Sequence, residues 1–169
     1  TSGIDLSAAA VELSRKNSPT SIVELARVTK IPFPDQTFDF ITCIGVLEHF
    51  TELEQSITEM KRVAKNAAVF CIMVPNSRTL YWKVWQRFSK EHRESNENAL
   101  SLKEWQELFQ RYGFKIRELS RDEWRLQKMA VLLGIKVGSR FYQTVKKLIW
   151  NIIPLSHAQQ FVFILMVDS

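Results

Sequence analysis

Short apolar runs alternate with stretches of helical periodicity along the chain. Apolar residues that run together or alternate predict strands over residues 3–6, 22–26, 38–44, 67–74, 114–119 and 161–167. Apolar residues at helical spacing predict helices after Ser7, around residues 53–63 and over 101–112. The stretch 67–74 is almost wholly apolar, as in a central parallel strand that is buried on both faces. This order predicts an α/β fold with a mostly parallel sheet.

Local capping signals set the predicted ends of two helices. Ser7 is placed to cap the first helix, and Ser101 with Glu104 has the spacing of a capping box at the start of a later one. Gly113 follows the last periodic residue of that helix and is expected to end it.

Residues 124–155, between the last two predicted strands, are expected to be helical, with interruptions at Gly134, Gly138 and Pro154. The segment is both apolar and basic, and its cations include Lys136, Arg140, Lys146 and Lys147. A basic amphipathic helix lies on an anionic membrane surface or covers a pocket of its own domain. Both interpretations stay open, a lid insertion over a pocket of the domain and a peripheral membrane contact.

Composition limits the class of protein. With 169 residues, 46% hydrophobic and 24% charged, the chain is expected to form one globular domain over residues 1–169. Cys43 and Cys71 lie in apolar runs, which indicates buried thiols in a reducing, cytoplasmic environment. The net charge of +5 is modest and allows acidic partners such as phospholipid headgroups. Tryptophans such as Trp82 and Trp85 recur with other apolar residues at helical spacing, which favours core packing over nucleic-acid binding. No metal site is expected, because no histidines, cysteines and carboxylates have ligand spacing.

Asp5 follows an apolar strand in the sequence GIDLS at residues 3–7. Ligands of open α/β sheets bind at the carboxyl ends of the strands, where an acidic residue accepts both ribose hydroxyls of a nucleoside. An aspartate here also has a purely structural role available, the capping of the following helix. Asp5 alone does not decide between a nucleoside site and a helix cap.

Further motifs follow Asp5 in a fixed order: IPFPDQTFDFI at residues 31–41, VLEHF at 46–50, MKRV at 60–63, VPN at 74–76 and YGFKI at 112–116. Together with the Asp5 strand, this set resembles class I S-adenosylmethionine-dependent methyltransferases, in particular the small-molecule type that includes ubiquinone and menaquinone methyltransferases. The resemblance covers residues 3–119 and the last strand. It implies a Rossmann-like sheet with a helical insertion before the last strand.

The resemblance also implies positions for S-adenosylmethionine. Asp5 would hold the ribose hydroxyls, and Leu6 would lie against the adenine ring. Arg27 and Val28 stand where the family has an acidic residue and its neighbour, which bind the adenine amino group. Arg27 departs from that pattern because a guanidinium accepts no hydrogen bond. The adenine would therefore depend on the Val28 backbone and on apolar packing.

Ile44 and Gly45 would line the turn beside the methionine half of the cofactor, by the same resemblance. Glu48 and His49 would start the next helix and face the methyl acceptor. His49 has two roles open to it, a structural hydrogen bond at a helix start or a general base near neutral pH. A base is optional in this chemistry, because methyl transfer from a sulfonium depends mainly on alignment.

One motif of the family is absent. Class I methyltransferases bind the methionine end of the cofactor with a GxGxG turn after their first strand, and the five glycines of this chain do not form it. That strand would lie in the middle of the sheet, so we expect a gap between the strands that contain Ile4 and Phe40. A missing N-terminal segment, a partner chain or a decayed gene copy would each account for the gap.

The expected function is methyl transfer from S-adenosylmethionine to a small-molecule, lipid-linked or saccharide-linked acceptor. The alternative is a non-catalytic, methyltransferase-like interaction module that has lost its cofactor loop. The absent glycine turn and Arg27 favour this alternative.

Overall fold

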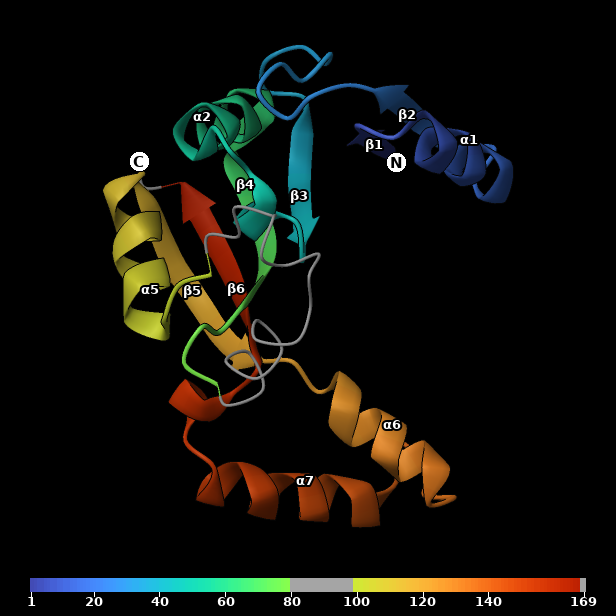
Figure 1. The fold of residues 1–169 in the computed structure, drawn as a ribbon, viewed down its shortest axis with the longest axis vertical. Coiled ribbons are helices and arrows are strands. Elements are labelled where there is room, and N and C mark those ends of the chain that lie inside the picture. The colour runs from blue at the N-terminus through green and yellow to red at the C-terminus, as the bar shows by residue number, and fades with distance from the viewer. Residues whose placement is uncertain (80–98, 168–169) are drawn as a thin grey trace.

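The computed structural model describes residues 1–79 and 99–167 and arranges their strands in two sheets (Figure 1). The smaller sheet pairs β1 (Ser2–Asp5) with β2 (Ile22–Leu25) in parallel. The larger sheet has the strand order β3 (Phe38–Ile44), β4 (Ala64–Pro75), β6 (Gln160–Val167) and β5 (Phe114–Arg121). The predicted α/β fold and all the predicted strands are confirmed.

The larger sheet is mixed in direction. β4 runs parallel to β3 but antiparallel to β6, and β6 is also antiparallel to β5. The stretch 67–74 therefore lies inside the sheet as predicted, but only one of its two neighbours is parallel. The cause is topological, because the last strand enters the sheet between β4 and β5 from the opposite end.

The helices of the described residues are α1 (Ala8–Asn17), α2 (Leu53–Val63), α5 (Leu102–Arg111), α6 (Trp124–Leu132) and α7 (Arg140–Ile152), with short 3-10 turns η1 (Leu47–His49) and η2 (Leu155–His157). The Ser7 hydroxyl accepts a hydrogen bond from the Ala10 amide at the start of α1. Ser101 and Glu104 form the predicted capping box of α5. Glu48 and His49 do not start α2. They form the separate turn η1, because the chain bends after Phe50 before the helix begins.

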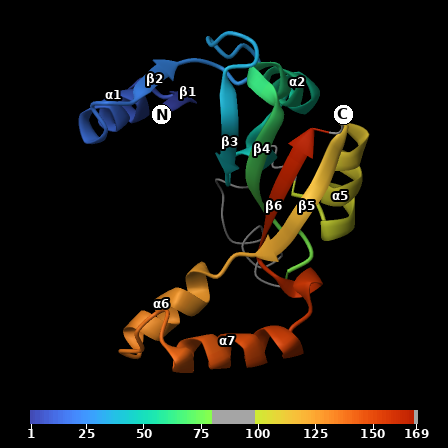
Figure 2. The ribbon, with the colours of Figure 1, turned by 180° about the vertical axis from the view of Figure 1, so that it is seen from behind.

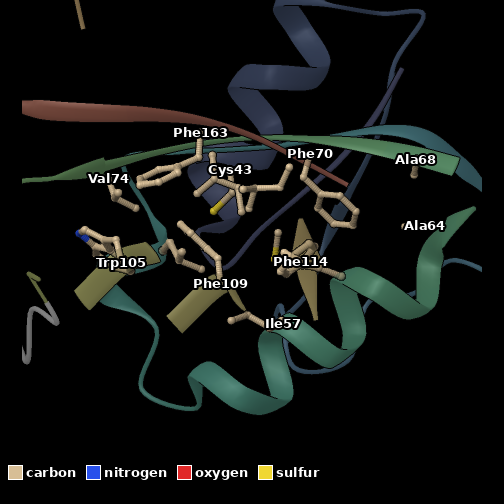
Figure 3. Packing of buried hydrophobic residues seen from close by; sticks show 14 of the residues in the cluster. Cys43, Ile57, Ala64, Ala68, Phe70, Val74, Trp105, Phe109, Phe114 and Phe163 are labelled. Carbon is tan, nitrogen blue, oxygen red and sulfur yellow. The ribbon is translucent and has the colours of Figure 1, made fainter. Parts of the chain in front are cut away.

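The core lies between the larger sheet and the helices α2 and α5 (Figure 3). Trp105 and Phe109 of α5 are fully buried, and the Phe109 ring meets Phe163 of β6 edge-on at 4.9 Å between centroids. Each such buried aromatic side chain contributes about 1.5–3 kcal/mol to stability. Core packing is thus confirmed for Trp105, whereas Trp82 and Trp85 lie outside the described residues.

A break separates the two sheets, as the sequence predicts. Among the described residues, β1 pairs only with β2, and β3 pairs only with β4. The unit of β1, β2 and α1 lies beside β3 without joining its sheet (Figure 2). It is still attached to the domain, because Ile4 and Val28 pack against the main core. Phe40, in the middle of β3, remains 74% exposed next to this break.

Residues 124–155 form a helical arm between β5 and β6, which we call the α6–α7 arm. It extends from the end of the larger sheet at which β3, β4 and β5 finish, opposite the end that carries α2 (Figure 1). Gly134, Gly138 and Pro154 interrupt it, as predicted. In the part of the chain that the structure describes, no helix has the length and apolarity to cross a membrane.

Candidate functional site

Asp5 and Leu6 lie at the carboxyl end of β1 and are both exposed. One carboxylate oxygen of Asp5 accepts a hydrogen bond from the Ser7 amide at 2.8 Å. Asp5 therefore supports the turn into α1, but it does not cap the helix, a role that Ser7 takes. This contact uses Oδ1 only, so a ribose could still be bound by the other carboxylate oxygen.

Arg27 and Val28 follow directly after β2 and lie beside Asp5. The strand register places Asp5 opposite Leu25, and the Ala26 amide donates to the Asp5 carbonyl at 3.0 Å. The Arg27 side chain is exposed, whereas Val28 is half-buried. The structure thus brings all four residues that were predicted for the adenosine half to one edge of the small sheet.

Ile44 and Gly45 lie at the carboxyl end of β3, in the other sheet. The Gly45 amide donates to the Met73 carbonyl of β4 at 2.9 Å, which extends the ladder by one residue. Gly45 has a φ of +64°, and a side-chain carbon added there would meet no atom within 4 Å. The turn after β3 therefore offers open space beside backbone that favours glycine.

Glu48 and His49 follow in the turn η1, with opposite exposure. The Glu48 side chain is buried, whereas 44% of the His49 side chain is exposed, and the His49 Nε2 lies 4.0 Å from Glu48 Oε1. Burial and the nearby Glu48 charge raise the pKa of the Cys43 thiol to about 12. Cys43 therefore stays protonated near neutral pH and does not act as a nucleophile. Of Glu48 and His49, it is His49 that has the exposed side chain and is therefore accessible to a ligand.

The predicted site residues thus form two groups on two sheets. Asp5, Leu6, Arg27 and Val28 gather at the end of β1 and β2. Ile44 ends β3, and Gly45 and His49 follow it. No strand pairing joins the groups within the described ranges. Those ranges also contain no cluster of histidine, cysteine and carboxylate groups that could hold a metal ion.

Arg62 organises the loop that leads into β3, a role the sequence did not suggest. Its guanidinium donates to the carbonyls of Ile31 and Phe33 and to the carboxylates of Asp35 and Glu59. The hydrogen bonds from Arg62 hold the pKa of Glu59 below its usual range. The available signal was the i,i+3 spacing of Glu59 and Arg62 on a predicted helix. That spacing does not reveal the backbone carbonyls, which approach only in the folded chain.

Comparison with known proteins finds methyltransferases among the proteins that are similar to this chain. A family model described as a methyltransferase domain matches residues 1–72. YcgJ of Bacillus subtilis, named as an uncharacterized methyltransferase, is 26% identical over 132 residues, or 73% of this chain and 51% of YcgJ. A SAM-dependent methyltransferase from Aquifex aeolicus has a TM-score of 0.60 at 16% identity, over 98% of this chain and 68% of that chain. A Haloferax volcanii structure of a complex with the Trm112 methyltransferase activator gives a TM-score of 0.68 at 15% identity, over 99% of this chain and 71% of that chain.

The fold of the chain is similar to that of solved SAM-dependent methyltransferases. Residues 1–72 are the part that matches the methyltransferase-domain family itself. The chain spans between 36% and 55% of the length of the curated relatives it matches.

Proposed function

We propose that this protein transfers the methyl group of S-adenosylmethionine to a small-molecule, lipid-linked or saccharide-linked acceptor. The observation that carries the proposal is the grouping of Asp5, Leu6, Arg27 and Val28 at the carboxyl ends of two parallel strands. In open α/β sheets this edge is the usual binding place for nucleotide-like ligands.

The residues at this edge suit the adenosine half of the cofactor. Asp5 supplies a carboxylate at the end of a strand, where ribose hydroxyls are bound in such sheets. Leu6, which is 67% exposed, offers an apolar surface for the adenine ring. The Val28 backbone supplies the polar contact to the adenine amino group, because the Arg27 guanidinium only donates.

The turn after β3 belongs to the methionine half. Ile44 is half exposed there, and Gly45 leaves room for a ligand atom to approach the backbone. When bound, S-adenosylmethionine supplies an electrophilic methyl group on a positively charged sulfur. His49 is proposed to orient the acceptor and, when neutral, to accept its proton at a ring nitrogen. Because alignment dominates this chemistry, we expect His49 to matter less than the residues that place the two substrates.

A further strand between β1 and β3 is part of the proposal. The support is that, among the described residues, β1 and β3 each pair with one strand, together with the exposed Phe40 in the middle of β3. Backbone groups on such an edge are stabilised by pairing with another strand. The strand would come from a segment outside residues 1–169 or from a partner chain. It would also bring a turn for the methionine carboxylate, since the sequence has no glycine-rich turn.

The α6–α7 arm is proposed to form a lid beside the acceptor site. It starts from β5 and returns to β6 at the end of the sheet where β3 and β4 also finish (Figure 1). We propose that the lid is in peripheral contact with a membrane. We expect the protein to work in the reducing environment of the cytoplasm, because both cysteines are free thiols.

A non-catalytic interaction module is the second candidate function. The exposed Arg27 favours it, because a cation replaces the acceptor that would bind adenine. The break between β1 and β3 favours it as well, because a strand from a partner protein could pair there.

Hydrogen exchange of the full-length protein with and without S-adenosylhomocysteine separates the two candidates. Methyl transfer predicts ligand-dependent protection of the backbone amides in residues 5–8, 26–29 and 44–49. The helix α5 serves as an internal control that should not change, and methionine alone serves as a control ligand. If the full-length protein gains no protection in these three segments, the proposed cofactor site is wrong and the interaction module is favoured.

A further inference from the structure

The positive charge of the chain is concentrated in the α6–α7 arm. Residues 124–155 contain six basic side chains and no Asp or Glu; the cations are Arg125, Lys128, Lys136, Arg140, Lys146 and Lys147. The whole chain has 23 basic and 18 acidic residues, so the remainder is close to neutral. A segment of this length without a single acidic residue is suited to an anionic partner.

The exposed apolar side chains are concentrated in the same segment. Of the 16 large hydrophobic side chains that are exposed in the described part of the chain, nine lie between residues 129 and 153: Met129, Val131, Leu132, Leu133, Val137, Phe141, Leu148, Ile152 and Ile153. Leu132 and Leu133 are 85% and 70% exposed where α6 ends. A concentration of exposed apolar side chains of this kind normally marks a binding surface.

The connection between the two helices gives this apolar end a defined shape. Gly134 and Gly138 have φ values of +68° and +98°, which other residues rarely adopt. The Ile135 amide closes the end of α6 by donating to the Ala130 carbonyl, and the Ser139 hydroxyl caps α7. Leu132 and Leu133 therefore lie at a helix end whose backbone is held by hydrogen bonds.

The inner side of α7 is held by the end of β5. The Arg121 guanidinium donates to the Ile153 carbonyl at 2.8 Å and lies over the Trp150 ring, 4.5 Å from its centroid. Lys146 forms an ion pair with Glu123 at 3.1 Å. These contacts fix which face of α7 points away from the sheet.

The outer side of α7 carries an apolar stripe with no cover in the described residues. Phe141, Leu148 and Ile152 are spaced i, i+7 and i+11, so they lie on one face of the helix. Arg140 and Lys147, also seven residues apart, are exposed beside the stripe. An apolar stripe flanked by cations is the pattern of helices that lie in the interface of a bilayer.

We propose that the α6–α7 arm binds the surface of an anionic lipid membrane. Leu132, Leu133 and the α7 stripe enter the acyl region, and the exposed cations Lys136, Arg140 and Lys147 meet the headgroups. Charge argues against a second copy as the occupant, because two arms would bring six cations against six. The attachment is peripheral, since no described helix is able to span a bilayer. This inference deepens the membrane contact proposed for the lid and rests on it, whereas its test is independent of methyl transfer because lipid binding requires no cofactor.

Vesicle co-sedimentation of the full-length protein tests the proposal, with phosphatidylcholine vesicles that contain or lack phosphatidylglycerol. One variant combines Lys128→Gln, Lys136→Gln and Lys147→Gln. Its matched control combines Lys16→Gln, Lys30→Gln and Lys115→Gln, three exposed lysines outside the arm. A second variant combines Leu132→Asn and Leu133→Asn, with Leu13→Asn on α1 as its control. All replaced side chains are exposed, so the fold should persist, and thermal unfolding checks this.

The expected result is salt-sensitive binding to the anionic vesicles only. The lysine variant of the arm should bind about 100-fold more weakly, at roughly 1 kcal/mol for each lysine near an anionic membrane. The leucine variant should bind more weakly and lose its residual binding in high salt, whereas both controls should bind like the unchanged protein. Equal binding by arm and control variants, or no binding by any, would overturn the proposal. So would sedimentation equilibrium that shows a dimer lost only in the leucine variant, because the surface would then serve a second copy.

Discussion

At the scale of single residues, Gly45 has a backbone conformation that favours glycine over all other residues. It lies between β3 and the turn η1 with a φ of +64°, and its amide donates to the Met73 carbonyl. The left-handed conformation costs other L-residues about 1–2 kcal/mol. No atom lies within 4 Å of an added Cβ, so the cost of a side chain there is conformational and not steric.

We predict that Gly45→Ala lowers the free energy of unfolding by about 1–2 kcal/mol, for this conformational reason. Urea denaturation of both proteins measures the difference. Gly3→Ala is the matched control, because its added Cβ also meets open space while its φ is not positive. An equal loss in the two variants would show that φ at Gly45 is not the cause.

At the scale of elements, Arg62 connects α2 to the loop before β3. Its guanidinium, which is partly buried, donates to the Ile31 and Phe33 carbonyls and bonds Glu59 through two nitrogens. Lysine has the same charge but lacks the planar fork that makes several such bonds at once. The loop therefore depends on the shape of the guanidinium as well as on its charge.

Arg62→Lys is expected to lower the free energy of unfolding, as for the loss of hydrogen bonds to a charged group. Arg15→Lys, at the more exposed pair with Glu24, is the control and should cost less than about 1 kcal/mol. The difference in the free energy of unfolding between the unchanged protein and Arg62→Lys should also depend on pH. Because Arg62 lowers the folded pKa of Glu59, the stabilisation is present above the ordinary value of 4.5 and is lost as pH falls through the lowered pKa. Urea titrations across this range would contradict the assignment if the difference stayed constant.

The elements of this fold were largely predictable, because their signals are local. The capping box of Ser101 and Glu104 and the glycine breaks of the arm follow from residues close in sequence. The direction of β6 was not predictable in this way, since an apolar run does not specify which strand it pairs with. The role of Arg62 was hidden for the same reason, as its partners at Ile31 and Phe33 are about 30 residues away.

At the scale of the whole molecule, the break between β1 and β3 dominates the architecture. The sequence predicted it, because the absent glycine turn removes a strand that the family has in the middle of the sheet. The residues of the candidate site are correspondingly divided, with Asp5, Leu6, Arg27 and Val28 on one side and Ile44, Gly45 and His49 on the other. The sequence could not predict how much apolar surface the arm exposes, because exposure depends on what the folded domain leaves uncovered.

Calorimetric titration of the full-length protein with S-adenosylhomocysteine tests the central claim, that the cofactor binds at the carboxyl end of β1. Asp5→Ala should weaken binding by about 1.5–3 kcal/mol, or roughly 10- to 150-fold, through the loss of hydrogen bonds to a charged group. Asp39→Ala is the matched control, because this exposed aspartate pairs with Lys65 near the start of β3, and its affinity should not change. Tight binding that is the same in the unchanged protein and in Asp5→Ala would contradict the placement of the ribose at β1.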